Sequence, residues 1–465
     1  MSVYEPVEHI TDRTAQPGAG VETAAAGRSW LILAPALWVF ATWALLARPA
    51  GTPTWRTVWA EDGAIFLSDA YKHPGVTGWF LPYQGYLHLL PRMIATLAQI
   101  FDPVYAAVVM SALSAAVGAL CLVLFAHAVS SRLNGAWWAP VAVLLAVLLA
   151  NTLGGEVAAN IANVHWFLTL GLLGLALSPL RNPWIAACAA LVVLVFALSD
   201  ALAVVAVPVA LASAGLGWWA ARGSVEPSSG RFVPWFVPAA ATLGASVQQV
   251  ITWTYPRFMP PPNPEFGSAR AILRSYDQLV VLGGVIPQLQ EWVSPQAGAV
   301  GLALITVALL SVAWIAGGDG RWERLGLALV FLLLSVATFA LSAVVNQGVA
   351  ERHRALPSAL LVAGLLVPVI GRVRIQRYLL LATCTLVVAL ELLSFRTTPW
   401  RSAGPDWATS IREAAVSQCK GSHAESAKVL IEPMPVVPPP WVVTIPCERL
   451  GDSSALPSQG SDSSG

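Results

Sequence analysis

Long apolar stretches recur along the whole chain, and each is about as long as a helix needs to be to cross a bilayer. They lie at roughly 30–47, 104–129, 137–153, 164–180, 184–199, 201–221, 234–254, 298–316, 325–345, 355–370 and 378–395. A spanning segment must satisfy its own backbone hydrogen bonds, so such stretches form helices in a membrane. The pattern predicts an all-α polytopic membrane protein with about eleven transmembrane helices.

The composition agrees with this class. Of the 465 residues, 56% are hydrophobic and only 11% are charged, which is typical of integral membrane proteins. The net charge of +1 says nothing about partners, because in such a chain the signal is where Lys and Arg fall among the loops, and nothing in the sequence supports nucleic acid as a partner. The lipid bilayer is therefore the first expected partner.

The two ends of the chain read as polar tails. Residues 1–28 are predicted to be a disordered cytoplasmic segment, and residues 453–465, rich in Ser and Gly, a disordered tail. Trp30 to Ala47 reads as a retained signal anchor, with cleavage of this segment as the alternative.

Basic residues fall in alternate turns of the predicted transmembrane domain, 29–395. With a cytoplasmic N-terminus, the positive-inside rule places on the inner side Arg132, Arg181, Arg222, Arg231, Arg321, Arg324, Arg372, Arg374 and Arg377. The outer side then receives the loops 48–103, 154–163, 255–297 and 346–354 and the C-terminal segment. We expect a multi-pass protein of the plasma membrane with an extracytoplasmic C-terminal tail.

The segment 396–452 is predicted to form a small extracytoplasmic α/β unit. Two β-like runs, 427–431 and 441–445, flank a Pro-rich stretch. Cys419 and Cys447 both lie in this segment, and an oxidising compartment favours a disulfide between them, with two free thiols as the alternative. A bridge would staple a unit that is too small for a large core.

Glu61 and Asp62 are adjacent carboxylates at the start of the first outer loop. Either could act as a general base that takes the proton of an attacking hydroxyl. Equally, they could be the acidic first turn of a short helix over 60–71, complementing its dipole.

His88 and Arg92 lie at the end of the same loop, four residues apart and on one face if a helix extends back over Pro91. Arg92 could bind the phosphate of a lipid-linked substrate, or it could be a snorkelling interfacial anchor.

Three polar residues in the middle of the chain are further substrate-binding candidates. Asn160 and Asn163, three apart, could face one cavity and offer donors and acceptors to a sugar; the alternative is a solvated loop. Asp200 stands between two apolar segments, where a carboxylate is costly unless it is paired or hydrated, so it is either functional or a cap.

Arg352, His353 and Arg354 precede a late apolar stretch on the predicted outer side, against the positive-inside trend. A phosphate or diphosphate would account for them, as would an internal ion pair with an acidic residue. The sequence contains no metal-binding or phosphate-loop motif, so we expect no required cofactor and leave a divalent metal open.

Together these motifs resemble the GT-C superfamily of integral membrane glycosyltransferases, in a bacterial branch. The resemblance is carried by the Glu61-Asp62 pair, the Tyr86-Leu87-His88…Pro91 stretch and the Arg352-His353…Pro357 stretch. The C-terminal segment is similar to small outer domains of some bacterial members.

The resemblance implies an inverting enzyme that moves a sugar from a polyprenyl-phosphate donor to a glycan or lipid acceptor of the cell envelope. It assigns the catalytic carboxylate to Asp62, with Glu61 as the alternate, and a donor-phosphate contact to Arg352. His88 and Pro91 would line the cavity. The alternatives are a polytopic transporter or lipid flippase, and a non-catalytic subunit of a cell-envelope assembly complex.

Overall fold

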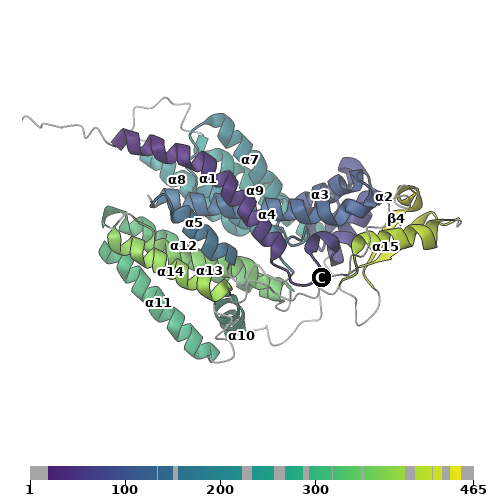
Figure 1. Cartoon of the computed structure of the whole chain (residues 1–465). Helices are drawn as coiled ribbons and strands as arrows, with labels where there is room; N and C mark the ends of the chain where they lie inside the picture. The colour runs from purple at the N-terminus through teal and green to yellow at the C-terminus, as the bar shows by residue number, and fades with distance from the viewer. Residues whose placement is uncertain are drawn as a thin grey trace, which may run out of the picture.

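The computed structural model describes a largely helical protein with two small hairpins (Figure 1). It describes residues 19–133, 135–149, 156–221, 233–255, 268–285, 293–316, 318–346, 350–371, 373–392, 404–420, 423–431 and 440–451. The predicted disordered segments at 1–18 and 453–465 lie outside these ranges.

Every predicted apolar stretch contains a helix. These helices are α1 (Ala19–Ala47), α4 (Ala106–Arg132), α5 (Ala139–Leu149), α6 (His165–Leu177), α7 (Pro183–Ala197), α8 (Val207–Ala221), α9 (Phe236–Thr254), α11 (Pro295–Ala316), α12 (Arg321–Asn346), α13 (Ala355–Leu366) and α14 (Arg374–Leu392). Residues 19–28 are helical, so the predicted disorder of that part is wrong. Its Ala-rich sequence has high helix propensity and continues the apolar helix.

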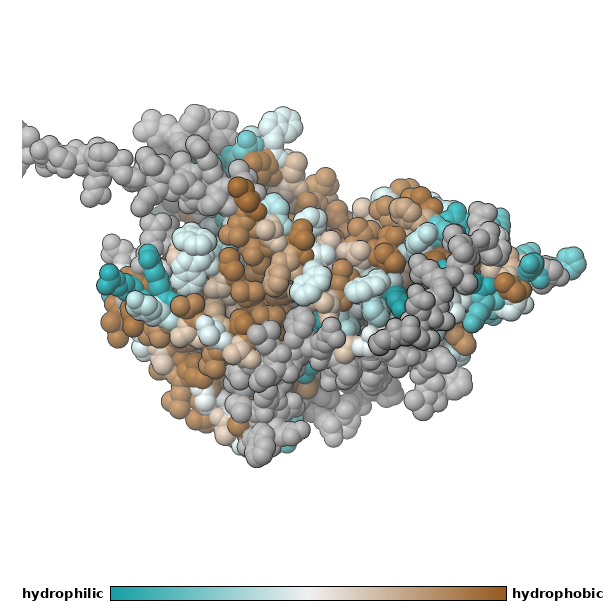
Figure 2. Space-filling view, in the orientation of Figure 1, coloured by the Kyte–Doolittle hydropathy of each residue, from teal (hydrophilic) through white to brown (hydrophobic). Residues whose placement is uncertain are grey.

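Four described segments are long and apolar enough to cross a membrane: Pro103–Arg132, Ala201–Trp219, Ala297–Ile315 and Arg321–Asn346. Five shorter apolar helices accompany them. Only 6% of the apolar window of Ala297–Ile315 is buried, so this helix presents its side chains outward almost all round. Figure 2 shows apolar side chains over much of the visible helical body, as is compatible with a membrane protein.

The first predicted outer loop folds into short elements. They are η2, a π-helical turn (Asp62–Leu67), α2 (Ser68–Lys72), the strands β1 (Pro82–Tyr83) and β2 (Tyr86–Leu87), and α3 (Leu89–Ile100). The strands are joined by Gln84 and Gly85, with φ of 51° and 80°, the left-handed pair that a two-residue hairpin turn requires.

The C-terminal segment forms the predicted α/β unit. It contains α15 (Trp407–Ala414), η15 (Ala415–Cys419), α16 (Cys447–Leu450) and the antiparallel strands β3 (Ser426–Leu430) and β4 (Val442–Pro446). Alternate residues of both strands are buried, which is the two-residue period expected of a half-buried sheet.

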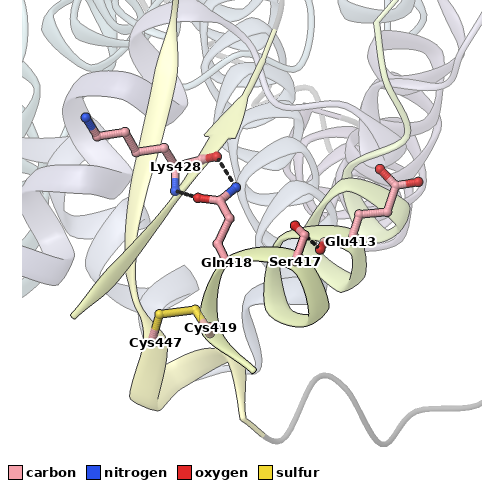
Figure 3. The surroundings of a disulfide bond; sticks show 6 residues. All are labelled: Glu413, Ser417, Gln418, Cys419, Lys428 and Cys447. Atoms are coloured by element: carbon pink, nitrogen blue, oxygen red, sulfur yellow. Dashed lines mark hydrogen bonds between the residues drawn. A yellow bond between two sulfur atoms is a disulfide. The ribbon is translucent and has the colours of Figure 1, made fainter. Parts of the chain in front are cut away.

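The predicted disulfide between Cys419 and Cys447 is present and ties the end of η15 to the start of α16 (Figure 3). On the same side of the unit, the Gln418 amide donates to the Lys428 carbonyl at 3.0 Å and accepts from the Lys428 N–H at 2.9 Å. The amide pair thus fastens η15 to β3, and the disulfide fastens it to α16 directly after β4.

This unit does not stand apart from the first predicted outer loop. Trp407 and Val443 belong to the same buried apolar cluster as Phe66 and Ile94. The Trp407 indole donates to the Pro103 carbonyl at 2.7 Å. The C-terminal unit and residues 58–107 therefore share one core, which Figure 1 shows as the yellow unit beside α2 and α3.

An ion pair and hydrogen bonds lie at the opposite end of α4. Arg132, its last residue, pairs with Glu323 at the start of α12 at 3.0 Å and donates to Ser213 of α8 at 2.9 Å. Arg324 donates to the Ile370 carbonyl at 3.0 Å. The turn after α4, the start of α12 and the residues that follow α13 therefore meet at this end of the molecule.

Candidate functional site

A cavity of about 500 Å³ lies where several of the predicted outer loops meet. It is lined from the first loop, the hairpin, the start of α6, the turn before α8 and the segment between α12 and α13. Its polar lining residues are Glu61, Tyr83, Gln84, Tyr86, His88, Asn163, His165, Asp200, Ser342, Asn346, Arg352 and His353.

The two adjacent carboxylates of the first loop have different environments. Asp62 is 2% exposed and does not line the cavity; its carboxylate accepts the Ile161 N–H at 3.2 Å and the Ala162 N–H at 2.9 Å. Glu61 is half-buried and lines the cavity. Successive residues of a helical turn point in different directions, so one carboxylate can hold a neighbouring loop while the other faces the cavity.

Two non-glycine residues in left-handed conformation stand beside this contact. Ala60 has φ of 29° and precedes Glu61, and Ala159 has φ of 52° and precedes the loop that Asp62 holds. Such conformations cost about 1–3 kcal/mol each and persist where the surroundings fix them, often at functional sites.

Arg352 is the cation that lines the cavity. Its guanidinium pairs with Glu156 at 2.9 Å, and its side chain is 40% exposed. Burial acts to lower its pKa, but the charges of Glu156 and Glu61 outweigh burial, so the pKa is raised and the residue stays cationic. Arg354 is half-buried and does not line the cavity.

The charge of Glu61 reaches other cavity residues as well. Burial raises the pKa of Tyr83, and Glu61 adds to this, whereas Gln84 and Arg352 oppose it. Glu61, Tyr83 and Arg352 thus act on one another across a single cavity.

His353 and Asn163 line the cavity, and their polar atoms are partly occupied by structural contacts. His353 Nδ1 accepts from the Ala350 N–H at 3.2 Å, and its ring lies 5.9 Å from that of Trp166. Asn163 donates to the Glu156 carbonyl at 3.0 Å and accepts from the Trp166 indole at 3.3 Å.

Besides Arg354, two other predicted binding residues do not line the cavity. Asn160 is fully buried and does not line the cavity. Its side-chain oxygen accepts the Asn163 N–H at 3.0 Å and so stabilises the loop. Arg92 is 3% exposed; it pairs with Asp69 at 3.0 Å and lies against the Phe66 ring, 5.4 Å from its centroid. The internal contacts of Arg92 replace the phosphate contact that its position suggested.

His88 does line the cavity, but not in the predicted geometry. Helix α3 begins at Leu89, and His88 precedes it with φ of −123°, so His88 and Arg92 do not share a helical face. His88 lies among the rings of Tyr86, Tyr83 and Phe66, with centroids 4.0, 5.7 and 5.3 Å away.

Asp200 lines the cavity from the turn before α8 and is 1% exposed. One carboxylate oxygen caps the helical turn Ala201–Ala206 by accepting the Leu202 N–H at 2.9 Å, and the other accepts the Thr169 hydroxyl at 2.5 Å. Burial raises the pKa of Asp200 to about 7, although these two hydrogen bonds oppose the shift. Asp200 is therefore the cap that the sequence left as one alternative, and it also lines the cavity.

Sequence reasoning missed Tyr83, Tyr86, Phe66 and His165 as cavity residues. The Tyr-Gln-Gly-Tyr order carried a usable signal, because a Gly in a two-residue turn between aromatic residues is typical of a hairpin. Among the described residues, no group of three or more His, Cys, Asp or Glu side chains is placed to hold a metal ion.

The chain matches no family model, no curated protein and no solved structure.

Proposed function

We propose that the protein is a membrane glycosyltransferase that moves a sugar from a polyprenyl-phosphate donor to a hydroxyl of a glycan or lipid acceptor. The observation that carries the proposal is the pairing in one cavity of a carboxylate that lines it, Glu61, with a cation, Arg352. Glycosyl transfer from a phosphate requires a base for the acceptor and a positive charge for the leaving group.

In this mechanism the acceptor hydroxyl attacks the anomeric carbon of the sugar while Glu61 takes the hydroxyl proton. The bond between that carbon and the phosphate oxygen breaks, and the electron pair leaves with the polyprenyl phosphate. Negative charge grows on the departing oxygen, so a fixed Arg352 stabilises the transition state more than the ground state. Attack from the face opposite the phosphate inverts the anomeric configuration.

The placement of the cavity supports a lipid-linked donor. Ser342 and Asn346 line it from the end of α12, one of the helices apolar enough to cross a membrane. A donor whose prenyl chain stays in the bilayer would present its phosphate and sugar at such a helix end. The proposed orientation has this end outside the plasma membrane and the N-terminus in the cytoplasm.

The test is transfer from a panel of radiolabelled polyprenyl-phosphate sugars in membranes that contain the wild type, Glu61→Gln or Arg352→Gln at matched protein levels. We expect Glu61→Gln to lower turnover by about 10²–10⁴-fold, the usual contribution of a general base. Glu323→Gln is the matched control and should retain full transfer. Glu323 lies at the start of α12 and pairs with Arg132, at the opposite end of α4 from the C-terminal unit. Equal transfer in all the variants would refute the mechanism, and no transfer by the wild type from any donor would favour transport or assembly.

A further inference from the structure

One wall of the cavity consists of four rings, which we call the aromatic wall: Phe66, Tyr83, Tyr86 and His88. Phe66 comes from η2, and the other three come from the hairpin and the residue that follows it. The rings of Phe66 and Tyr83 meet edge to face, 5.9 Å apart, and the ring of His88 lies within 5.7 Å of all the others.

His88 is a buried polar group whose hydrogen-bonding capacity is mostly unused, since in the described part of the chain only the Tyr83 carbonyl acts on its ring as a hydrogen-bond acceptor. It is 3% exposed, and neither ring nitrogen has a hydrogen-bond partner of normal geometry among the described residues. Buried polar side chains are nearly always paired, so an unpaired one that lines a cavity points to a ligand that would pair it.

The imidazole of His88 is held in its neutral form. Burial lowers its pKa well below the usual value, the nearby His165 and Arg92 act in the same direction, and the Tyr83 carbonyl only partly opposes them. A neutral imidazole has one N–H donor and one acceptor nitrogen. A sugar hydroxyl, which both donates and accepts, complements this pair, whereas a phosphate prefers a cationic donor.

We propose that the aromatic wall is the subsite for the uncharged pyranose ring of the substrate, with His88 donating to one sugar hydroxyl and accepting from another. The proposal rests on the proposed function and deepens it, because it assigns the sugar and the phosphate to different walls of the cavity. The rings of the wall pack against the C–H face of the pyranose. Arg352 binds the phosphate.

The backbone on both sides of His88 is fixed, as a binding subsite requires. The Gln248 side chain of α9 accepts the Leu87 N–H at 2.9 Å and donates to the Leu87 carbonyl at 3.0 Å. On the other side, the Leu89 N–H donates to the Leu198 carbonyl at 3.3 Å, and the Leu90 N–H donates to the Ser199 hydroxyl at 2.8 Å.

The experiment compares the binding of two lipids, a polyprenyl-phosphate hexose and sugar-free polyprenyl phosphate, to the full-length protein in nanodiscs. His88→Phe keeps a ring and removes both hydrogen bonds. We expect this variant to bind the sugar-bearing lipid about tenfold more weakly, which is the effect of losing one or two hydrogen bonds, and to bind the sugar-free lipid as the wild type does. Arg352→Gln should weaken both lipids.

Two further variants control for structure. His88→Gln retains a donor and an acceptor, and it should recover part of the sugar-dependent affinity. His127→Phe removes a different histidine, one stacked on Trp30 at 4.1 Å and outside the cavity lining, and it should bind both lipids as the wild type does.

Unchanged binding of the sugar-bearing lipid to His88→Phe would overturn the inference, and so would an equal loss for both lipids in His88→Phe. A second readout, saturation-transfer NMR with methyl pyranosides, separates the subsite from the proposed function. If the wild type binds neither lipid but gives a pyranoside signal that His88→Phe abolishes, the subsite stands and the glycosyltransferase fails. If transfer occurs and His88→Phe leaves it and the lipid binding unaltered, the function stands and the subsite fails.

Discussion

The contrast between Glu61 and Asp62 can be tested by changing each carboxylate to its amide. Asp62→Asn keeps one oxygen for the two backbone N–H groups of Ile161 and Ala162 and turns an NH₂ group toward the other. Losing one hydrogen bond to a charged group costs about 1.5–3 kcal/mol, and the unsatisfied buried donor adds to this. We expect a loss of about 2–4 kcal/mol of stability.

Glu61→Gln should behave in the opposite way. Glu61 is half-buried and lines the cavity, so its amide should change stability by less than about 0.5 kcal/mol and reduce turnover sharply. The assay pairs the thermal unfolding midpoint of purified protein in detergent with sugar transfer per folded molecule. If Asp62→Asn unfolds at the wild-type temperature and abolishes turnover, the catalytic carboxylate is Asp62 and the assignment to Glu61 is refuted.

Three other changes, which concern packing, the disulfide and pH, are followed by the same unfolding midpoint. Gly63→Ala should destabilise by about 1–3 kcal/mol, because its Cβ would lie 2.6 Å from the side chains of Val58 and Val443; Gly217→Ala, with nothing within 4 Å, should not destabilise. Cys419→Ser should cost about 3–4 kcal/mol by the chain-entropy relation for a loop of about 29 residues, an effect that reductant should reproduce in the wild type. Asp200 has a folded pKa of about 7 against 3.8 normally, so the folded state keeps its proton over this range while the unfolded state loses it. Stability should therefore fall by roughly 4 kcal/mol at most as pH rises from about 4 to 7, and an Asp200→Asn variant that showed the same fall would contradict the assignment.

Properties that depend on local sequence were predictable. The apolar stretches predicted the helices, the alternation at 427–431 and 441–445 predicted β3 and β4 to within a residue, and the compartment argument predicted the Cys419–Cys447 bridge. Each of these follows from periodicity or from a rule that concerns one segment at a time.

The roles of individual side chains depended on contacts between distant segments. Asp62 is bound by backbone groups about 100 residues later, and Arg352 pairs with a carboxylate 196 residues earlier. Nothing near Asp62 in the sequence distinguishes it from Glu61. Arg92 is the exception, because its partner Asp69 lies only 23 residues away. The sequence did not decide whether α3 begins before or after Pro91, so the direction of the Arg92 side chain could not be predicted.

The shared core of the C-terminal unit and the first loop bears on how Glu61 is held. Gly63 packs against Val443 and Ile431 of the C-terminal unit, and the Ser68 hydroxyl, which donates to the Gly63 carbonyl at 3.0 Å, accepts the Thr444 N–H at 3.1 Å. The turn that carries Glu61 is thus fixed from one side by Asp62 and from the other by a unit nearly 400 residues later in the chain. A base acts best when its position is set before the substrate arrives, because no binding energy is then spent on ordering it. The C-terminal unit is therefore part of the scaffold of the site, and its removal should impair transfer even though none of its described residues line the cavity.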